Sequence, residues 1–100
     1  MTDWGLVYED FVDKVGDAFV IAEDGFPAIG LTLIECELLK TRQLPPSGRP
    51  PYSLIFVADT PQMLEQRLYC LDHPTMGKNV IFLVPVGKEA RGFLYQALFN

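Results

Sequence analysis

Length and composition limit this chain to one small globular domain. It has 100 residues, of which 49% are hydrophobic and 21% charged, so it is too short for two domains and too apolar for a disordered segment. The net charge of −5 arises in residues 1–24, which hold seven acidic side chains and one basic side chain. Because proteins that bind a phosphate backbone need clustered lysine and arginine, we expect no nucleic-acid partner.

No segment has the features that direct a chain into or across a membrane. No apolar run approaches the roughly 20 residues of a membrane span, and the N-terminus lacks the basic head and apolar core of a signal peptide. Cys36 and Cys70 each lie in an apolar run, which is typical of reduced, buried thiols. We therefore expect a cytoplasmic, single domain over residues 1–100, with no membrane partner.

The first predicted element is a helix from about Val7 to about Val15. Apolar residues recur on one side of it, acidic residues occupy its exposed side, and Gly16 is a natural terminator. From residue 18 onward the hydrophobic period changes to two. Residues 18–21 are predicted to form a short strand, followed by a turn at residues 23–25.

The longest alternating run covers residues 29–40 and predicts a strand with one wet face. Its buried face is expected to carry Thr32, Ile34, Cys36 and Leu38, opposite Glu35 and Glu37. Leu31 and Leu33 fall on the glutamate side, which indicates a start that is covered on both faces or bulged. Residues 41–51 contain four prolines and a glycine and predict an extended surface loop before a doubly buried strand at residues 52–58.

Residues 60–71 fit two structures. Thr60-Pro61 followed by spaced leucines is typical of a capped helix. The alternative is at most one turn of helix, followed by a strand that carries Tyr69, Leu71 and His73. Beyond a turn at residues 73–77, residues 80–84 predict a fully buried strand, residues 86–92 a polar hairpin loop and residues 93–99 a final strand.

Together these elements predict a mainly β (α+β) fold, with one N-terminal helix and about six antiparallel strands in a meander. Strands that are apolar on both faces curl into a small barrel or fold into a two-layer sandwich, and the pattern does not choose between them. We expect the helix to cover an open end or an edge of the sheet.

The sequence lacks the residue sets of common active and metal sites. Hydrolases need a base beside their nucleophile, yet His73 is the only histidine and is expected to cap its turn through backbone hydrogen bonds. Cys70 and His73 are three apart, which places them on opposite faces of a strand, so we expect no metal. Glu35 and Glu37 are expected to form a solvated strand face, and we predict no enzyme activity and no cofactor.

The segment Arg42-Gln43-Leu44-Pro45-Pro46 superficially resembles a polyproline ligand with a basic anchor. The second proline of a PxxP core would fall at Gly48, so we interpret the segment as a stiff surface loop.

Three motifs in the second half resemble a family of small uncharacterised bacterial proteins of about this length. They are Tyr-x-Leu-x-His-Pro-x-x-Gly at residues 69–77, Phe-Leu-Val-Pro-Val-Gly at residues 82–87 and Tyr-x-Ala-x-Phe-Asn at residues 95–100. The resemblance favours the strand that carries Tyr69, Leu71 and His73 over the helix. It also implies an association with phage-tail-like or tail-collar proteins, and its shared residues are turn formers and apolar strand positions.

The expected function is therefore a protein-interaction or assembly module, with a phage-tail-like particle as one setting. Trp4 and Tyr8 are expected to contact a partner beside the acidic helix or to form a lid on the barrel, and an exposed last strand would allow homo-oligomers. The alternative is a ligand-binding β-barrel or an enzyme with a pocket near Tyr69, His73 and Tyr95. A roomy pocket there favours the alternative, and an interior filled by Phe and Leu favours the interaction module.

Overall fold

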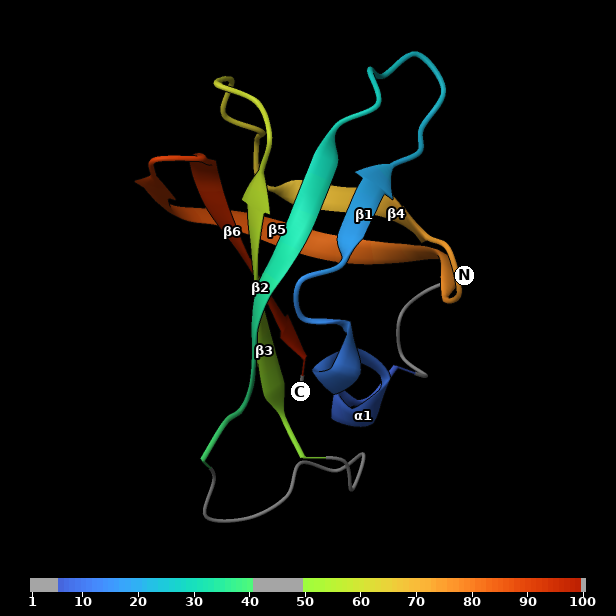
Figure 1. Cartoon of the computed structure of the whole chain (residues 1–100), viewed down its shortest axis with the longest axis vertical. Coiled ribbons are helices and arrows are strands. Elements are labelled where there is room, and N and C mark those ends of the chain that lie inside the picture. Colours follow the sequence, from blue (N-terminus) through green and yellow to red (C-terminus); the bar gives the residue numbers. More distant parts are fainter. Residues whose placement is uncertain (1–5, 41–49, 100) are drawn as a thin grey trace.

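The computed structural model describes residues 6–40 and 50–99 and contains a short helical segment followed by six strands (Figure 1). The elements are α1 (Tyr8–Phe11), the 3-10 helix η1 (Val12–Lys14), β1 (Ala18–Ile21), β2 (Gly30–Leu38), β3 (Tyr52–Ala58), β4 (Arg67–His73), β5 (Gly77–Glu89) and β6 (Gly92–Phe99).

The six strands close into an antiparallel barrel with the order β1-β2-β3-β6-β5-β4. The expected fold class is confirmed, and the ring selects a barrel over a sandwich. The single meander is corrected: β1–β3 and β4–β6 form two separate meanders, joined where β3 pairs with β6 and β1 pairs with β4. Both joins are contacts between strands distant in sequence, which a local pattern cannot reveal.

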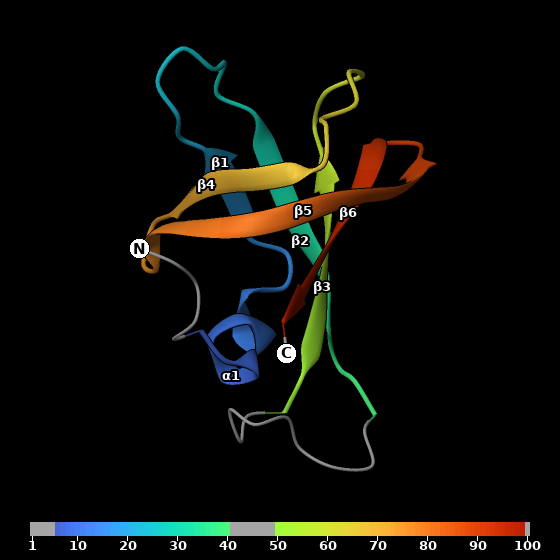
Figure 2. The same cartoon turned by 180° about the vertical axis from the view of Figure 1, so that it is seen from behind.

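The helical segment closes one end of the barrel (Figure 2). Phe11 is fully buried, and its ring centre lies 6.4 Å from that of Phe19, 6.0 Å from that of Tyr52 and 5.9 Å from that of Phe99. Gly16 ends the segment with a φ of 98°, a left-handed conformation that glycine adopts without steric cost. The predicted helix is thus confirmed in place, although its second half is a 3-10 turn.

The predicted irregularity in the longest strand is a β-bulge in β2. The register with β3 shifts between Leu33 and Glu35, so that Leu31 and Leu33 point into the core before the bulge. The bulge changes which residues of β2 face inward: Leu31 and Leu33 do so before it, in place of the expected Thr32, and Cys36 packs against the core after it. The expected burial of Leu38 is also wrong, because this residue lies at the strand end and is 46% exposed, although its partner Tyr52 is buried.

The ambiguous stretch before Tyr69 contains no helix. Residues 59–66 are bends and irregular backbone, and residues 67–73 form β4, with Tyr69, Leu71 and His73 buried as the strand interpretation requires. The strand expected at residues 80–84 is longer, because β5 changes partner along its length. Its residues 77–83 pair with β4 and its residues 84–89 pair with β6, so most of the expected hairpin loop is strand.

The interior of the barrel is filled by side chains. One cluster of buried residues runs through it: Phe11, Phe19, Ile21, Leu31, Leu33, Tyr52, Leu54, Phe56, Ala58, Leu64, Tyr69, Leu71, Ile81, Leu83, Tyr95 and Ala97. The last strand is not an exposed edge, since β6 pairs with β3 on one side and β5 on the other. The expected route to homo-oligomers through that edge therefore lacks its structural basis.

Candidate functional site

The aromatic residues expected near the helix are only partly described. Trp4 lies outside the described residues. Tyr8 is half-buried on α1, and its ring meets that of Tyr52 edge-on, with 6.3 Å between ring centres. Tyr8 therefore contributes to the lid that closes the barrel.

Tyr69 and Tyr95 belong to the barrel core, and their hydroxyl groups hold the loop between β3 and β4. The Tyr69 hydroxyl donates a hydrogen bond of 2.6 Å to the Glu65 carbonyl oxygen. The Tyr95 hydroxyl oxygen accepts one of 2.7 Å from the Leu64 amide. Because Leu64 is buried with them, these two bonds fasten residues 64–65 over one end of the barrel.

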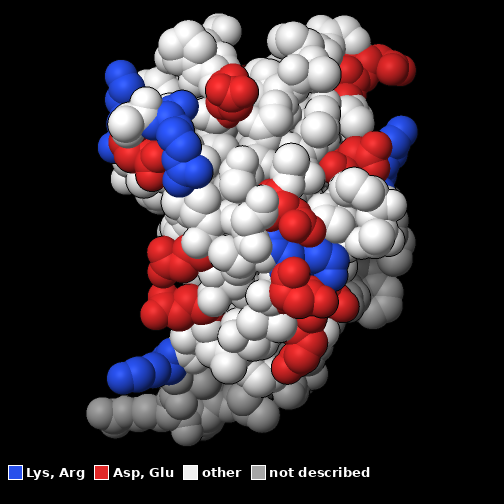
Figure 3. Space-filling model, in the orientation of Figure 1, with Lys and Arg blue, Asp and Glu red and all other residues white. Residues whose placement is uncertain are grey.

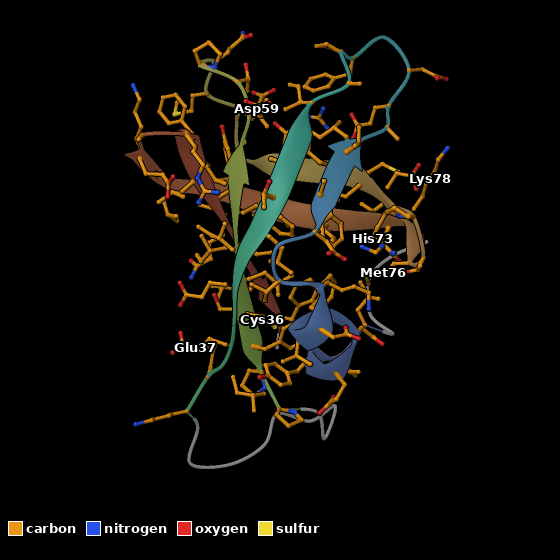
Figure 4. All side chains as sticks on the ribbon, viewed as in Figure 1. Cys36, Glu37, Asp59, His73, Met76 and Lys78 are labelled. Carbon is orange, nitrogen blue, oxygen red and sulfur yellow. The ribbon has the colours of Figure 1, made fainter. Side chains whose placement is uncertain are left out.

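His73 is buried at the end of β4 and uses both ring nitrogens (Figure 4). Its Nδ1 accepts hydrogen bonds from the amides of Thr75, at 3.1 Å, and Met76, at 3.3 Å. Its Nε2 lies 2.8 Å from Oδ2 of Asp17. A neutral ring with its proton on Nε2 satisfies all three contacts, so His73 caps the turn as predicted and ties it to the residue before β1.

Among the hollows formed by residues 6–40 and 50–99, Tyr69, His73 and Tyr95 do not line a common one. His73 lines a surface hollow of about 450 Å³ with Asp13, Lys14 and Thr75. Tyr69 lines a different hollow, and Tyr95 has no exposed surface. The interior of the barrel holds core side chains.

The two cysteines lie on separate strands as free thiols, Cys36 on β2 and Cys70 on β4. Burial raises the pKa of the Cys36 thiol, which lowers the fraction present as reactive thiolate. Within the described residues, no group of three or more His, Cys, Asp or Glu side chains is arranged to hold a metal ion. No helix in that part of the chain is long and apolar enough to cross a membrane.

A groove opens at the barrel end opposite the helix. This mouth groove has a volume of about 530 Å³ and is lined by Phe26, Pro27, Ile29, Gln62, Met63, Leu64, Glu65, Arg67 and Tyr69. The loop between β1 and β2 forms one wall and the loop between β3 and β4 forms the other. Figure 3 shows a notch between projecting loops at this end of the molecule.

Arg67 lies in the mouth groove, fixed on several sides. Its guanidinium carbon is 4.0 Å from the Tyr69 ring centre and 5.4 Å from that of Phe26. Its Nη2 donates to Oε1 of Glu23 at 2.8 Å. This hydrogen bond, with one from the Cys70 amide, holds the pKa of Glu23 below its usual value, and the same ion pair raises the pKa of Arg67.

A second candidate surface lies on the outside of β4 and β5, which cross the front of Figure 2. This outer β4–β5 face consists of Leu68, Cys70, Val80, Phe82 and Val84, which alternate with buried residues. Leu68 pairs with Phe82 across the two strands, and their exposures are 54% and 43%. The sequence interpretation missed this face, because an uninterrupted apolar run at residues 80–84 was taken to be buried on both sides.

Comparison with known proteins identifies one family. The family model described as "Domain of unknown function (DUF6916)" matches residues 6–99. Neither a curated protein nor a solved structure matches the chain. The match covers all six strands and the helix, so it agrees with the resemblance to a family of small uncharacterised proteins.

Proposed function

The chain belongs to the DUF6916 family, and we propose that it is a non-enzymatic protein-interaction module that binds a partner protein through the outer β4–β5 face. The carrying observation is the cross-strand pair of Leu68 and Phe82, two large apolar side chains about half exposed side by side. A barrel that fills its own interior gains nothing from leaving such a pair in water.

The free energy gained by covering this face is large enough to support binding of a protein. Covering one large apolar side chain contributes up to roughly 1.5–3 kcal/mol, so Leu68 and Phe82 together supply a centre for an interface. The five side chains of the face carry no formal charge, whereas Asp72 and Lys78 form a cross-strand pair at one end of it. The complementary partner is therefore a protein surface with an apolar, uncharged centre and a polar border.

The finer proposal is that the partner is a component of a phage-tail-like particle. Its support is the association implied by the family resemblance, which concerns neighbouring genes and not contacts. It predicts that the protein sediments with assembled particles and that the sedimenting fraction falls when the outer β4–β5 face is altered. The proposal is contradicted if particles purified from cells that express the altered protein carry as much of it as they carry of the wild-type protein.

The small-ligand alternative is less well supported by the geometry. It requires one cavity bordered by Tyr69, His73 and Tyr95, whereas these residues line separate hollows or the core. Both nitrogens of His73 already have partners, so the ring offers a ligand neither a free donor nor a free acceptor in this state.

Paired substitutions at two sites of similar exposure test the interaction proposal. Leu68→Asp with Phe82→Asp places charges on the outer β4–β5 face. Val12→Asp with Val15→Asp is the matched control, because those side chains are 42% and 47% exposed but lie on and beside η1. All variants must first melt cooperatively.

Immobilised wild-type protein and the Val12/Val15 variant are expected to retain the same stoichiometric partner from host extract, and the Leu68/Phe82 variant is expected to lose it. Retention of that partner by all three proteins, or by none of them, would overturn the proposal.

A further inference from the structure

We propose that the mouth groove binds the proline-rich segment, residues 40–51, of a second copy of this chain, so that copies associate head to tail. This contact is independent of the outer β4–β5 face. The groove and the ends of the segment lie at opposite ends of the barrel: β2 leads away from the groove and β3 returns to it (Figure 1). Figure 4 places Asp59 at the groove end and Glu37 towards the other.

The walls of the groove suit proline rings. Phe26 and Pro27 form one apolar wall, and Met63, which is 57% exposed, forms part of the other. Arg67 and Tyr69 also line the groove, with the guanidinium carbon 4.0 Å from the centre of the buried Tyr69 ring, so the accessible aromatic ring of the groove is that of the half-buried Phe26. Rigid proline residues lose little conformational entropy on binding and pack well on aromatic faces, which is why aromatic-lined grooves recur in proline recognition.

The charges of groove and segment are opposite. The two loops that form the walls, residues 22–29 and 59–66, contain four acidic side chains and no basic ones, and Arg67 adjoins them. The acidic side chains are Glu23, Asp24, Asp59 and Glu65. Residues 40–51 contain three basic side chains and no acidic ones: Lys40, Arg42 and Arg49. This complementarity favours encounter and weakens as salt is added.

Chain length excludes binding within one copy. The Leu39 amide donates to the Pro51 carbonyl oxygen at 2.9 Å, so the segment leaves and returns at one place. Eleven residues lie between them. A loop that returns to its starting point can extend over only half of its length, which is at most roughly 19 Å for eleven residues at about 3.4 Å each. The nine residues of β2 alone separate the segment from the groove by roughly 30 Å, at about 3.3 Å per residue. The occupant must therefore come from another copy.

The segment does not need a PxxP pair for this contact. Two-pocket polyproline sites read two prolines spaced along the ligand, whereas the mouth groove offers one apolar slot between Phe26 and Met63. Pro45-Pro46 matches one slot, and Arg42 and Arg49 flank this pair in the sequence, so that basic residues are available to the acidic loops on either side. Since the two contacting surfaces differ, the association is heterologous and extends into chains unless its rotation closes a ring.

Two variants that each remove one half of the contact test this proposal. The groove variant combines Phe26→Ala with Glu65→Lys, and the segment variant combines Pro45→Ala, Pro46→Ala and Arg49→Glu. Glu9→Lys on α1 is the control for a charge reversal at an exposed site. Molar mass is measured by light scattering at low salt over a concentration series.

Wild-type protein and Glu9→Lys are expected to grow in mass with concentration, and each of the other two variants alone is expected to stay monomeric. Their mixture should form one-to-one dimers and no longer species, because one variant keeps the segment and the other keeps the groove. Monomeric wild-type protein throughout, or a mixture that does not pair, would overturn the proposal.

A peptide titration provides a readout that does not depend on polymer length. A synthetic peptide of residues 40–51 is expected to shift the backbone amide resonances of Phe26, Met63 and Tyr69, and replacing both Pro45 and Pro46 by alanine should weaken binding at least fivefold. Leu68→Asp with Phe82→Asp should leave peptide binding unchanged, which separates this contact from the proposed function. Shifts absent at millimolar peptide, or confined to other residues, would contradict it.

Discussion

Arg67, the first residue of β4, and Glu23, in the loop after β1, are joined by a 2.8 Å hydrogen bond between Nη2 and Oε1. Glu23 also accepts a 2.8 Å hydrogen bond from the Cys70 amide, at the point where β1 has ended and β4 is paired only with β5. The Glu23 carboxylate thus adds one hydrogen bond to the β1–β4 ladder and fixes the loop between β1 and β2, one wall of the mouth groove, to the barrel.

Glu23 gives folding a defined pH dependence. Its pKa is lower in the folded protein than the ordinary value of 4.5, chiefly through the hydrogen bond from Arg67. Its contribution to stability is therefore complete above about pH 4.5 and is lost as the pH falls through the lowered value. We expect Glu23→Gln to unfold at lower urea concentration than wild type at pH 7 and at the same concentration near pH 2. Glu37→Gln is the exposed control, and a gap for Glu23→Gln that stays constant with pH would contradict the prediction.

The hydroxyl group of Tyr95 is expected to stabilise the fold. Tyr95→Phe tests this, because it removes the hydroxyl group and keeps the ring. That substitution leaves the buried Leu64 amide without its acceptor and is expected to lower the free energy of unfolding by about 2 kcal/mol. Urea unfolding measures the loss, and faster hydrogen exchange at the Leu64 amide locates it. Tyr69→Phe should have a smaller effect, because the Glu65 carbonyl lies on an exposed residue that water reaches. Equal losses in the two variants would show that the hydroxyl groups act in another way.

His73→Ala removes the cap of the β4–β5 turn. The amides of Thr75 and Met76 lose their acceptor and Asp17 loses its donor, so the expected loss is about 3 kcal/mol in urea unfolding. Asp17→Asn keeps an oxygen that accepts from Nε2 and should change stability by less than about 1 kcal/mol. A loss for Asp17→Asn as large as that for His73→Ala would mean that the charge of Asp17, and not the geometry of the cap, stabilises the turn.

Gly92 begins β6 at a position that admits no side chain. Its φ is 151°, and a Cβ atom there would overlap the Ala58 carbonyl oxygen. Gly92→Ala is expected to lower the free energy of unfolding by about 3 kcal/mol or more. Gly87→Ala is the matched control on the same hairpin, because its Cβ would lie 3.6 Å from the nearest atom, in ordinary contact with Leu94. The comparison is made by thermal melting, and similar melting temperatures for the two variants would refute the steric explanation.

The local hydrophobic pattern of the sequence predicted most of the helices and strands, but few of the contacts between them. Residues 18–21 and 52–58 are short apolar runs, and both are strands with the expected bounds. Leu38 and Phe82 were both expected to be buried, and their exposures are 46% and 43%. Leu38 lies at the end of β2, opposite the buried Tyr52 but beyond the core that covers that side. Phe82 lies on the outer face of β5 beside Leu68. Periodicity reports which side chains share a face, but not which face another strand will cover.

The sequence by itself predicted a small β-rich fold, a resemblance to small uncharacterised proteins and the turn cap by His73, and it fixed the composition of the proline-rich segment. The tertiary structure alone decided that the strands close into a barrel, that Tyr69, His73 and Tyr95 line no common hollow in the described part of the chain, and that Leu68 stands beside Phe82 in solvent. The reason is physical: propensity and alternation act over a few neighbouring residues, whereas barrel closure depends on β3 meeting β6 and β1 meeting β4, contacts between residues 40 or more positions apart in most of their pairs.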